Sequence, residues 1–450
     1  MPSLPSERAK TLKQAFQFCN LEGLRSEDFE RYYVDLSSVR SMEAIQGVST
    51  RLDFLEPGRG TILFTGHRGC GKTTELRRLQ RQWETDYRVI YLVANEELDI
   101  TDVEYIDLYL VLIKRVADDL AYLGLSFNST LLNQFQTWFM EVTSETEESV
   151  QKSISLETSA QAGFEVPLIS KLTAKLLAQI KGTNIQKTKI RQTLQQDIGR
   201  LKSDINLLLK DGFEKLTAND TSRYQKGFLV IFDNLDRVEP EVGNRLFFDY
   251  AAQLQELDCT LIYTVPISIA CSHKNLNHAF GKPNIVPMVN IYRFDEDSHD
   301  LELDKQAARR FAQIVAQRIE IDIVFESQPL LGQLVLASGG HARQLMMMTA
   351  TACLTAATRG HAKVLQEDVV YAIKQEQFNF ERIIPDEHYP LMVEVCRTKR
   401  IKLDAIGQLM LFNISVLEYE SSDRRWNYIN PVIKQSDAFK QALKNAGLTG

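Results

Sequence analysis

The fold is decided by the stretch Thr61-Ile62-Leu63-Phe64-Thr65-Gly66-His67-Arg68-Gly69-Cys70-Gly71-Lys72-Thr73-Thr74. Its first five residues are β-branched, apolar or aromatic, which predicts a short buried strand. The glycines that follow allow the backbone to curl with its N–H groups pointing inward. Good helix formers then run to Trp83, so the positive end of a helix dipole lies beside the loop. A strand, a glycine loop and a helix in this order predict a phosphate-binding loop.

The loop matches the pattern G-x-x-x-x-G-K-[ST], in which each residue type has a defined task. We expect Lys72 to reach the β- and γ-phosphates of a nucleotide and the Thr73 hydroxyl to ligate Mg²⁺. His67 lies inside the loop, where we expect its side chain to face solvent. The predicted phosphate-binding residues are Gly66, His67, Arg68, Gly69, Cys70, Gly71, Lys72, Thr73 and Thr74.

A second signal is the run Phe228-Leu229-Val230-Ile231-Phe232-Asp233-Asn234-Leu235-Asp236-Arg237. An aspartate that closes five apolar residues lies where a parallel strand ends, at the edge where ligands bind in open α/β sheets. We assign Asp233 to Mg²⁺, usually through water, and Asp236 to activation of the attacking water. The alternatives are a helix-capping role for Asp233 and a salt bridge or cap for Asp236.

Two more polar residues complete the predicted catalytic set with Lys72, Asp233 and Asp236. Thr264 ends the predicted strand 260–265 and is a candidate sensor of the γ-phosphate, although threonine is also common in strands for structural reasons. Arg343 lies on the first turn of a predicted helix, after Gly339 and Gly340. An arginine there can contact phosphate oxygens as a fork, and the alternative is a solvated or structural arginine.

Composition narrows the class of protein. The chain has 450 residues, which is typical of two or three domains, and its net charge of −7 argues against a general polyanion-coating protein. The six cysteines are scattered, so neither a disulfide framework nor a zinc site is expected. No apolar run approaches about 18 residues and no signal peptide is recognisable, so we expect a soluble, cytoplasmic protein without a membrane partner.

Hydrophobic periodicity divides the chain into four parts. We expect a helical extension over 1–55, a core over 56–299, a helical lid over 300–380 and a small domain over 381–450. The core should be interrupted by a helical insertion at about 125–222. The expected strands are 61–65, 88–93, 228–232, 260–265 and 285–291, with two more at 414–419 and 426–429.

Within the core and its insertion, three helical patterns stand out. Residues 104–123 follow a helical period, and 185–216 predict one amphipathic helix of about 30 residues. Residues 164–181 favour a helix that covers the core over one that binds a membrane surface. The acidic stretch 141–155 reads as a loop or a solvated helix.

The order of these parts resembles that of AAA+ ATPases, especially the initiator and STAND branches. In this resemblance Gly66 to Thr73 is Walker A, Phe228 to Asp233 is Walker B, Thr264 is sensor 1 and Arg343 is sensor 2. It implies an α/β fold with a parallel sheet of order 5-1-4-3-2, a helical lid that brings Arg343 to the nucleotide, and a C-terminal winged-helix domain.

Three departures from that pattern matter. AAA+ enzymes typically carry Asp-Glu where this chain has Asp233-Asn234, and the run through Asp236 looks more like that of NACHT and KAP-type STAND NTPases. No arginine lies between Thr264 and Arg293, where AAA+ rings often place an arginine finger, so hydrolysis completed by a second subunit is in doubt. The insertion before Walker B is far longer than one crossover needs.

The resemblance implies an Mg²⁺-dependent ATPase, slow in turnover, that acts as a switch in signalling or bacterial defence. Its partner would be another protein or a second copy, bound through the insertion at 125–222. The alternatives are a DNA-binding initiator- or transposition-type ATPase and, because of Asn234, a nucleotide-binding scaffold with little turnover. DNA contacts would come from Arg397, Lys399, Arg400 and Lys402.

Overall fold

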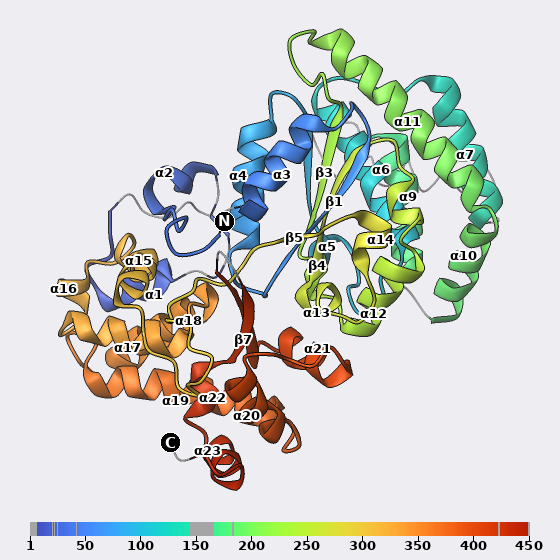
Figure 1. The fold of residues 1–450 in the computed structure, drawn as a ribbon. Helices are drawn as coiled ribbons and strands as arrows, with labels where there is room; N and C mark the ends of the chain where they lie inside the picture. The colour runs from blue at the N-terminus through green and yellow to red at the C-terminus, as the bar shows by residue number, and fades with distance from the viewer. Residues whose placement is uncertain are drawn as a thin grey trace.

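The computed structural model describes residues 7–19, 21, 23–24, 26–41, 43–143, 166–181, 184–421 and 424–448. A central sheet with helices on both faces forms one part of the molecule, and a helical lid with the C-terminal elements forms the other (Figure 1). Two apolar cores result. One joins a sheet face to the N-terminal segment, the lid and the C-terminal elements; the other joins the opposite face to the insertion.

Five parallel strands build the sheet in the order β2-β3-β4-β1-β5. This is the expected order 5-1-4-3-2, which is confirmed. All residues of β3 and β4 are buried, because helices cover both faces. The strands are β1 (Gly60–Gly66), β2 (Arg88–Val93), β3 (Phe228–Asp233), β4 (Thr260–Pro266) and β5 (Asn284–Ile285).

The strand expected over 285–291 is wrong beyond its first residue. The Val286 N–H still donates to the carbonyl of Thr65 at 2.7 Å, and the chain then leaves the sheet. Further on, the Asn290 N–H donates to the carbonyl of Val39 at 3.2 Å. This apolar segment therefore packs on the N-terminal segment and the lid, which periodicity alone cannot distinguish from a strand.

Helices flank the sheet and fix the strand ends. The helix expected over 104–123 is confirmed as α6 (Tyr105–Tyr122), and it is buried over most of its length. The others are α3 (Glu43–Phe54), α4 (Lys72–Trp83), α5 (Ala94–Glu97), α12 (Pro240–Asn244), α13 (Ile267–Ala270) and α14 (Leu276–Phe280). Short turns of helix follow β3 and α12, namely η2 (Leu235–Arg237), η3 (Arg245–Asp249) and η4 (Gln253–Gln255).

The insertion consists of α7 (Ser129–Thr143), α9 (Leu168–Ile180), α10 (Asn184–Gln196) and α11 (Ile198–Asn219). As expected, α9 buries its apolar side, and it does so against α6. The single helix expected over 185–216 is wrong, because the chain breaks at Asp197. Of the acidic stretch 141–155, residues 144–155 lie outside the described ranges.

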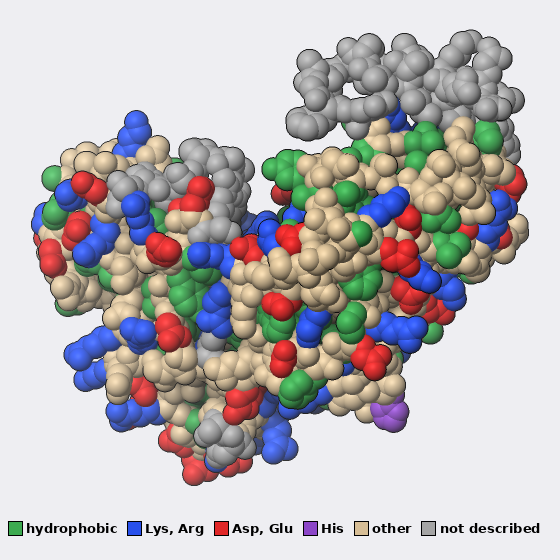
Figure 2. All heavy atoms as spheres, turned by 90° about the horizontal axis from the view of Figure 1, so that it is seen from above, with side chains coloured by type: hydrophobic (Ala, Val, Ile, Leu, Met, Phe, Trp, Pro, Cys, Tyr) green, Lys and Arg blue, Asp and Glu red, His purple; other side chains and the backbone are tan. Residues whose placement is uncertain are grey.

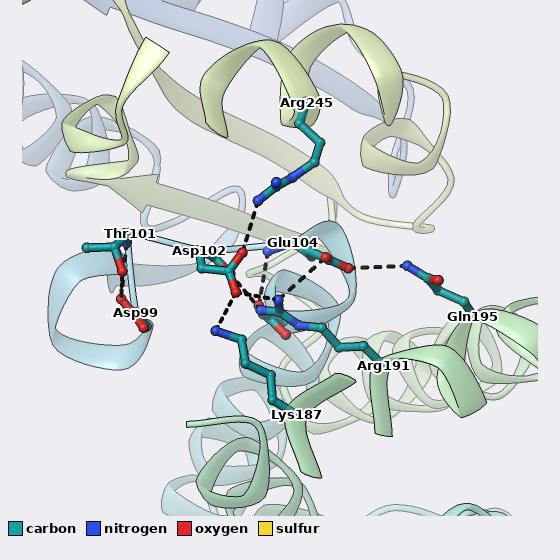
Figure 3. Close-up of polar contacts among 9 residues, drawn as sticks. Asp99, Thr101, Asp102, Glu104, Lys187, Arg191, Gln195 and Arg245 are labelled. Carbon is teal, nitrogen blue, oxygen red and sulfur yellow. Dashed lines mark hydrogen bonds and ion pairs between the residues drawn. The ribbon is translucent and has the colours of Figure 1, made fainter. Parts of the chain in front are cut away.

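An ionic cluster explains where α10 lies (Figure 3). The buried guanidinium of Arg191 contacts Asp102 at 3.0 Å and Asp107 at 2.5 Å, at the start of α6. Arg245, from η3, contacts the other oxygen of Asp102 at 3.2 Å. Because these contacts hold α10 against the core, the chain bends before α11 instead of continuing straight.

The N-terminal segment packs on the lid. Its α1 (Leu12–Phe18) lies against α18, and it continues through η1 (Ser26–Asp28) and α2 (Phe29–Tyr32). The lid consists of α15 (Lys305–Ala316), α16 (Ile321–Val324), α17 (Gln328–Ser338), α18 (Ala342–Thr358) and α19 (Gln366–Ile383).

The C-terminal elements are two helices, an antiparallel hairpin and two further helices. They are α20 (His388–Thr398), α21 (Ala405–Phe412), β6 (Val416–Glu420), β7 (Arg425–Ile429), α22 (Pro431–Lys434) and α23 (Asp437–Asn445). Helix α21 packs on α12 and α13 of the sheet domain. The helices and hairpin appear where expected, and their assignment as a winged helix stays a prediction. Among the described helices, none combines the length and apolar character needed to cross a membrane.

Candidate functional site

The glycine loop joins the end of β1 to the start of α4. Gly66, Gly69 and Gly71 have positive φ angles of 149°, 85° and 104°, which side chains disfavour. A Cβ at Gly66 would lie 2.5 Å from the carbonyl oxygen of Val286, and one at Gly69 would lie 2.6 Å from the Cβ of Arg343. The curled loop therefore requires glycine at 66 and 69.

Lys72 is held at the centre of this loop. Its Nζ donates to the carbonyl oxygens of Gly66 at 2.7 Å and His67 at 2.8 Å, and lies 2.9 Å from a carboxylate oxygen of Asp236. Burial lowers the pKa of the ammonium, but the charge and hydrogen bond of Asp236, together with smaller contributions from Cys70 and Asp233, raise it above its usual value. Lys72 is thus a buried cation tied to both predicted motifs.

Asp233 lies at the end of β3, one strand removed from β1. Its carboxylate accepts the Tyr91 hydroxyl at 2.8 Å and the Asn234 N–H at 2.8 Å, and it is also hydrogen-bonded by the Thr73 hydroxyl. Burial, followed by the Asp236 charge, raises its pKa. The two predicted Mg²⁺ ligands, Thr73 and Asp233, are therefore in contact.

The turn after β3 carries Asp236 and is fastened by Thr264. The Thr264 hydroxyl accepts the N–H groups of Leu235 at 2.9 Å and Asp236 at 3.3 Å. It also donates to the carbonyl of Phe232 at 3.0 Å. Thr264 thus positions the turn, and its contact with a γ-phosphate stays a prediction. Asp236 forms a salt bridge with Lys72, which is the alternative role that the sequence left open. Its role in activating water stays a prediction.

His67 does not face solvent, so that expectation is wrong. The C-terminal elements cover this side of the loop, leaving the His67 side chain 2% exposed. Its Nε2 accepts the Glu418 N–H of β6 at 2.8 Å. Burial, with a contribution from the nearby His341 and Lys72 charges, lowers its pKa to about 3. The loop is therefore bonded to the C-terminal hairpin.

His341 connects the loop to the lid. As the N-cap of α18, its Nδ1 accepts the Gln344 N–H at 3.1 Å, so its Nε2 carries the proton and donates to the Arg68 carbonyl at 2.5 Å. The Arg343 N–H donates to the carbonyl of Gly69 at 3.2 Å. Sequence reasoning missed His341, although a polar residue just before a helix is a capping signal.

The N-terminal segment supplies a wall that sequence reasoning also missed. A Cβ at Gly23 would lie 2.5 Å from the Cγ2 of Thr73. Arg40 donates to the Cys70 carbonyl at 3.1 Å and pairs with Glu75 at 2.5 Å. Between this segment and the lid the pocket has an apolar lining of Leu24, Val34, Leu36, Ile314 and Met346.

The loop residues Arg68 to Thr74 line the pocket, together with Asp233, Asp236 and Arg343. The structure thus brings the predicted site residues together, apart from Thr264, which lies behind the turn, and Gly66 and His67 at the base of the loop. A curled glycine loop in a pocket lined by several basic side chains, with a Thr73–Asp233 pair, fits a polyphosphate with Mg²⁺.

The predicted basic cluster of the C-terminal elements is corrected at Lys399. This residue is 2% exposed, and its Nζ donates to the carbonyl of Ser298 at 2.6 Å and to that of Cys396. Its ammonium is therefore unavailable to DNA. Arg397 pairs with Glu394 on the surface of α20. Arg400 and Lys402 are exposed as expected.

Acid should reduce the stability that the buried, neutral His67 and His341 contribute to the folded protein. The pKa of His341 is lowered to about 4 and that of His67 to about 3, against 6.5 in the unfolded chain. Only the unfolded chain takes up these protons between pH 6.5 and about 4. The stability is therefore complete above pH 6.5 and falls as pH drops toward 4.

We expect the urea midpoint to fall between pH 7 and about pH 5, and to fall less in His341→Gln. His273→Gln, at an exposed histidine, is the control and should keep the parent's pH dependence. A fall as steep in His341→Gln as in the parent would contradict the assignment.

The strand order, the glycine loop and the convergence of Lys72, Thr73 and Asp233 define a P-loop NTPase with an AAA+-like sheet. Residues 52–252 match the family described as the KAP family P-loop domain. This part of the chain is therefore similar to the KAP family P-loop domain, and the match spans the insertion.

Comparison with solved structures gives likenesses over most of the chain. Cdc6p from Pyrobaculum aerophilum is 12% identical with a TM-score of 0.38, covering 94% of this chain and 99% of that one. The ORC2 protein of Aeropyrum pernix, in ADPNP–ADP complexes, is 13% identical with a TM-score of 0.39, covering 94% and 97%. The ORC1 protein of Aeropyrum pernix, in complex with DNA, is 14% identical with a TM-score of 0.36, covering 91% and 93%. Because these TM-scores are low, we infer function from the chain's own residues. No curated protein gave a significant sequence match.

Proposed function

We propose that this protein is an Mg²⁺-dependent ATPase that acts as a nucleotide-controlled switch. The observation that carries the proposal is the convergence of Lys72, Thr73, Asp233 and Asp236 at one glycine loop. Lys72 and the loop backbone would hold the phosphates, and Thr73 and Asp233 would hold Mg²⁺. Bound Mg²⁺ neutralises charge on the phosphate oxygens. The buried Asp236, next to Lys72, would orient the attacking water.

A switch needs the nucleotide to act on more than one part of the molecule. The lid contributes Arg343 to the pocket and bonds the loop through His341, while the C-terminal hairpin bonds it through His67. A ligand that shifts the loop must therefore shift these contacts. ATP is proposed over GTP from the family resemblance, with the base in the apolar space between Leu24, Val34 and Met346.

The direct test is binding of a fluorescent ATP analogue, with GTP as competitor, together with phosphate release with Mg²⁺ and with EDTA. Micromolar ATP affinity and Mg²⁺-dependent release support the proposal. Absence of nucleotide binding would overturn it. Hydrolysis that survives Asp236→Ala would favour the scaffold alternative. Mass photometry with and without ATP then shows whether the nucleotide changes self-association, as a STAND-type signalling role requires.

Recognition of DNA is the alternative from a different class, and two features of the C-terminal elements weigh against it. Helix α21 packs on α12 and α13, and Lys399 is buried. On the face shown in Figure 2, basic and acidic side chains are interspersed and do not form one basic stripe.

We expect the triple variant Arg397→Ala, Arg400→Ala, Lys402→Ala to show the same weak retention on DNA at moderate salt as the parent. The matched control changes Lys440 and Lys444, in α23, to alanine. Retention that the triple variant loses and the control keeps would establish the DNA alternative instead.

A further inference from the structure

Three guanidinium groups meet at the nucleotide pocket from three separate elements. Arg68 comes from the glycine loop, Arg237 from η2 and Arg343 from the first turn of α18, and all three line the pocket beside Lys72. Burial lowers the pKa of Arg343, and the charges of Arg237 and Arg68 lower it further. The fold thus holds three like charges close enough to repel one another.

Within the described part of the chain, none of these three arginines forms an ion pair with a carboxylate. The nearby Asp236 is paired with Lys72 at 2.9 Å. The buried Nε of Arg343 has no hydrogen-bond partner, and the guanidinium of Arg68 lies over the ring of Phe412, 5.6 Å from its centroid. Asp236 is the carboxylate whose charge acts on Arg68 and Arg343, but it is already paired with Lys72. The cluster of cations therefore favours binding of a further anion with several oxygens.

The position of Arg237 in the chain indicates which phosphate of a bound nucleotide it would contact. It directly follows Asp236, whose carboxylate contacts the Lys72 ammonium. A lysine at this place in such loops reaches the β- and γ-phosphates, and Arg237 and Arg343 line the same pocket as Lys72. Between Thr264 and Arg293 the chain offers no arginine to a neighbouring subunit.

We propose that Arg237, together with Arg68 and Arg343, binds the terminal phosphate of ATP from within the same chain, so that no arginine of a second subunit completes the site. This inference rests on the proposed function. It makes Arg237 the residue that distinguishes ATP from ADP, because ADP lacks the phosphate that it would contact.

Binding of a non-hydrolysable ATP analogue and of ADP tests this directly. Arg237→Ala should weaken analogue binding by about 10-fold or more and leave ADP binding within about twofold. Arg237→Lys keeps the charge but loses the forked guanidinium, so its affinity for the ATP analogue should lie between that of the parent and that of Arg237→Ala. The control Arg382→Ala, at an exposed position in the last turn of α19, should change neither affinity. Thermal unfolding of each variant verifies that it is folded.

A mixing experiment tests the origin of the arginine. Phosphate release per chain should be independent of protein concentration, and mixing Arg237→Ala with Lys72→Ala protein should restore no turnover. Arg293→Ala, at the first arginine after Thr264, should keep full turnover. Restored turnover in the mixture, or its loss in Arg293→Ala, would show that a second subunit supplies the group.

Nucleotide affinities of the Lys72→Ala and Arg237→Ala variants distinguish failure of the proposed function from failure of the inference about Arg237. If Lys72→Ala leaves both ATP and ADP affinity unchanged, the proposed function itself is wrong. If Lys72→Ala removes both, but Arg237→Ala changes ATP and ADP binding equally or not at all, only the inference about Arg237 is wrong.

Discussion

Replacing Lys72 by alanine should reduce nucleotide affinity by at least about 100-fold, which corresponds to losing roughly 3 kcal/mol of charge-assisted hydrogen bonding. The ammonium is buried and charged, and it already bonds two carbonyl oxygens of the loop. Phosphate oxygens would exchange with these partners at small cost, and alanine offers no replacement. The measurement is titration of a fluorescent ATP analogue, with the surface variant Lys440→Ala as control.

The same substitution should also destabilise the fold, and the two effects can be separated. Without Lys72, the buried Asp236 carboxylate loses the cation with which it is paired, and breaking a buried ion pair by removing one partner typically costs about 3–5 kcal/mol. The double variant Lys72→Ala, Asp236→Asn removes both charges and should recover much of the melting temperature while remaining unable to bind nucleotide. Recovery of binding in the double variant would mean that Lys72 acts only through stability.

Asp233→Asn should raise the Mg²⁺ concentration that half-maximal turnover requires by about 10- to 100-fold. This is the range seen when groups that orient a metal are lost. The amide preserves the shape of the side chain but removes the charge that would face the metal. It also replaces an acceptor by a donor against the Tyr91 hydroxyl. The measurement is phosphate release as a function of Mg²⁺ concentration.

Tyr91→Phe is the matched control for that variant, because it removes a hydrogen bond to Asp233 without removing the carboxylate. It should shift the Mg²⁺ requirement by much less than Asp233→Asn does. Equal effects would indicate that the carboxylate serves to hold β2 and β3 together, and not to bind the metal.

Much of the fold follows from local sequence, and the failures have one physical origin. Strands β1 to β4 are largely apolar runs between turn residues, and β3 and β4 are buried on both faces, so pattern alone locates them. The segment 285–291 carries the same pattern but buries its side chains against the lid. The break at Asp197 depends on the distant Asp102 and Asp107, which no helical period reveals.

The site residues also divide into those that local sequence locates and those that depend on contacts with distant parts of the chain. Lys72, Thr73, Asp233 and Arg343 were predictable because their spacing and flanking elements carry the signal. His67 could not be placed, because its partner is a backbone N–H far along the chain at Glu418. The wall formed by Leu24 and Val34 was invisible for a different reason: apolar residues before the first strand look like any packed helix or turn.

The contact between His67 and Glu418 has a consequence for biosynthesis. On the ribosome, the glycine loop emerges long before the hairpin that covers His67. In a partly synthesised chain the His67 imidazole therefore lacks its hydrogen bond from Glu418, and the hairpin does not yet pack on the loop. We expect nucleotide binding to begin only after β6 has been translated and docked. Acquisition of ATP would then be limited to chains in which the C-terminal hairpin has docked on the glycine loop.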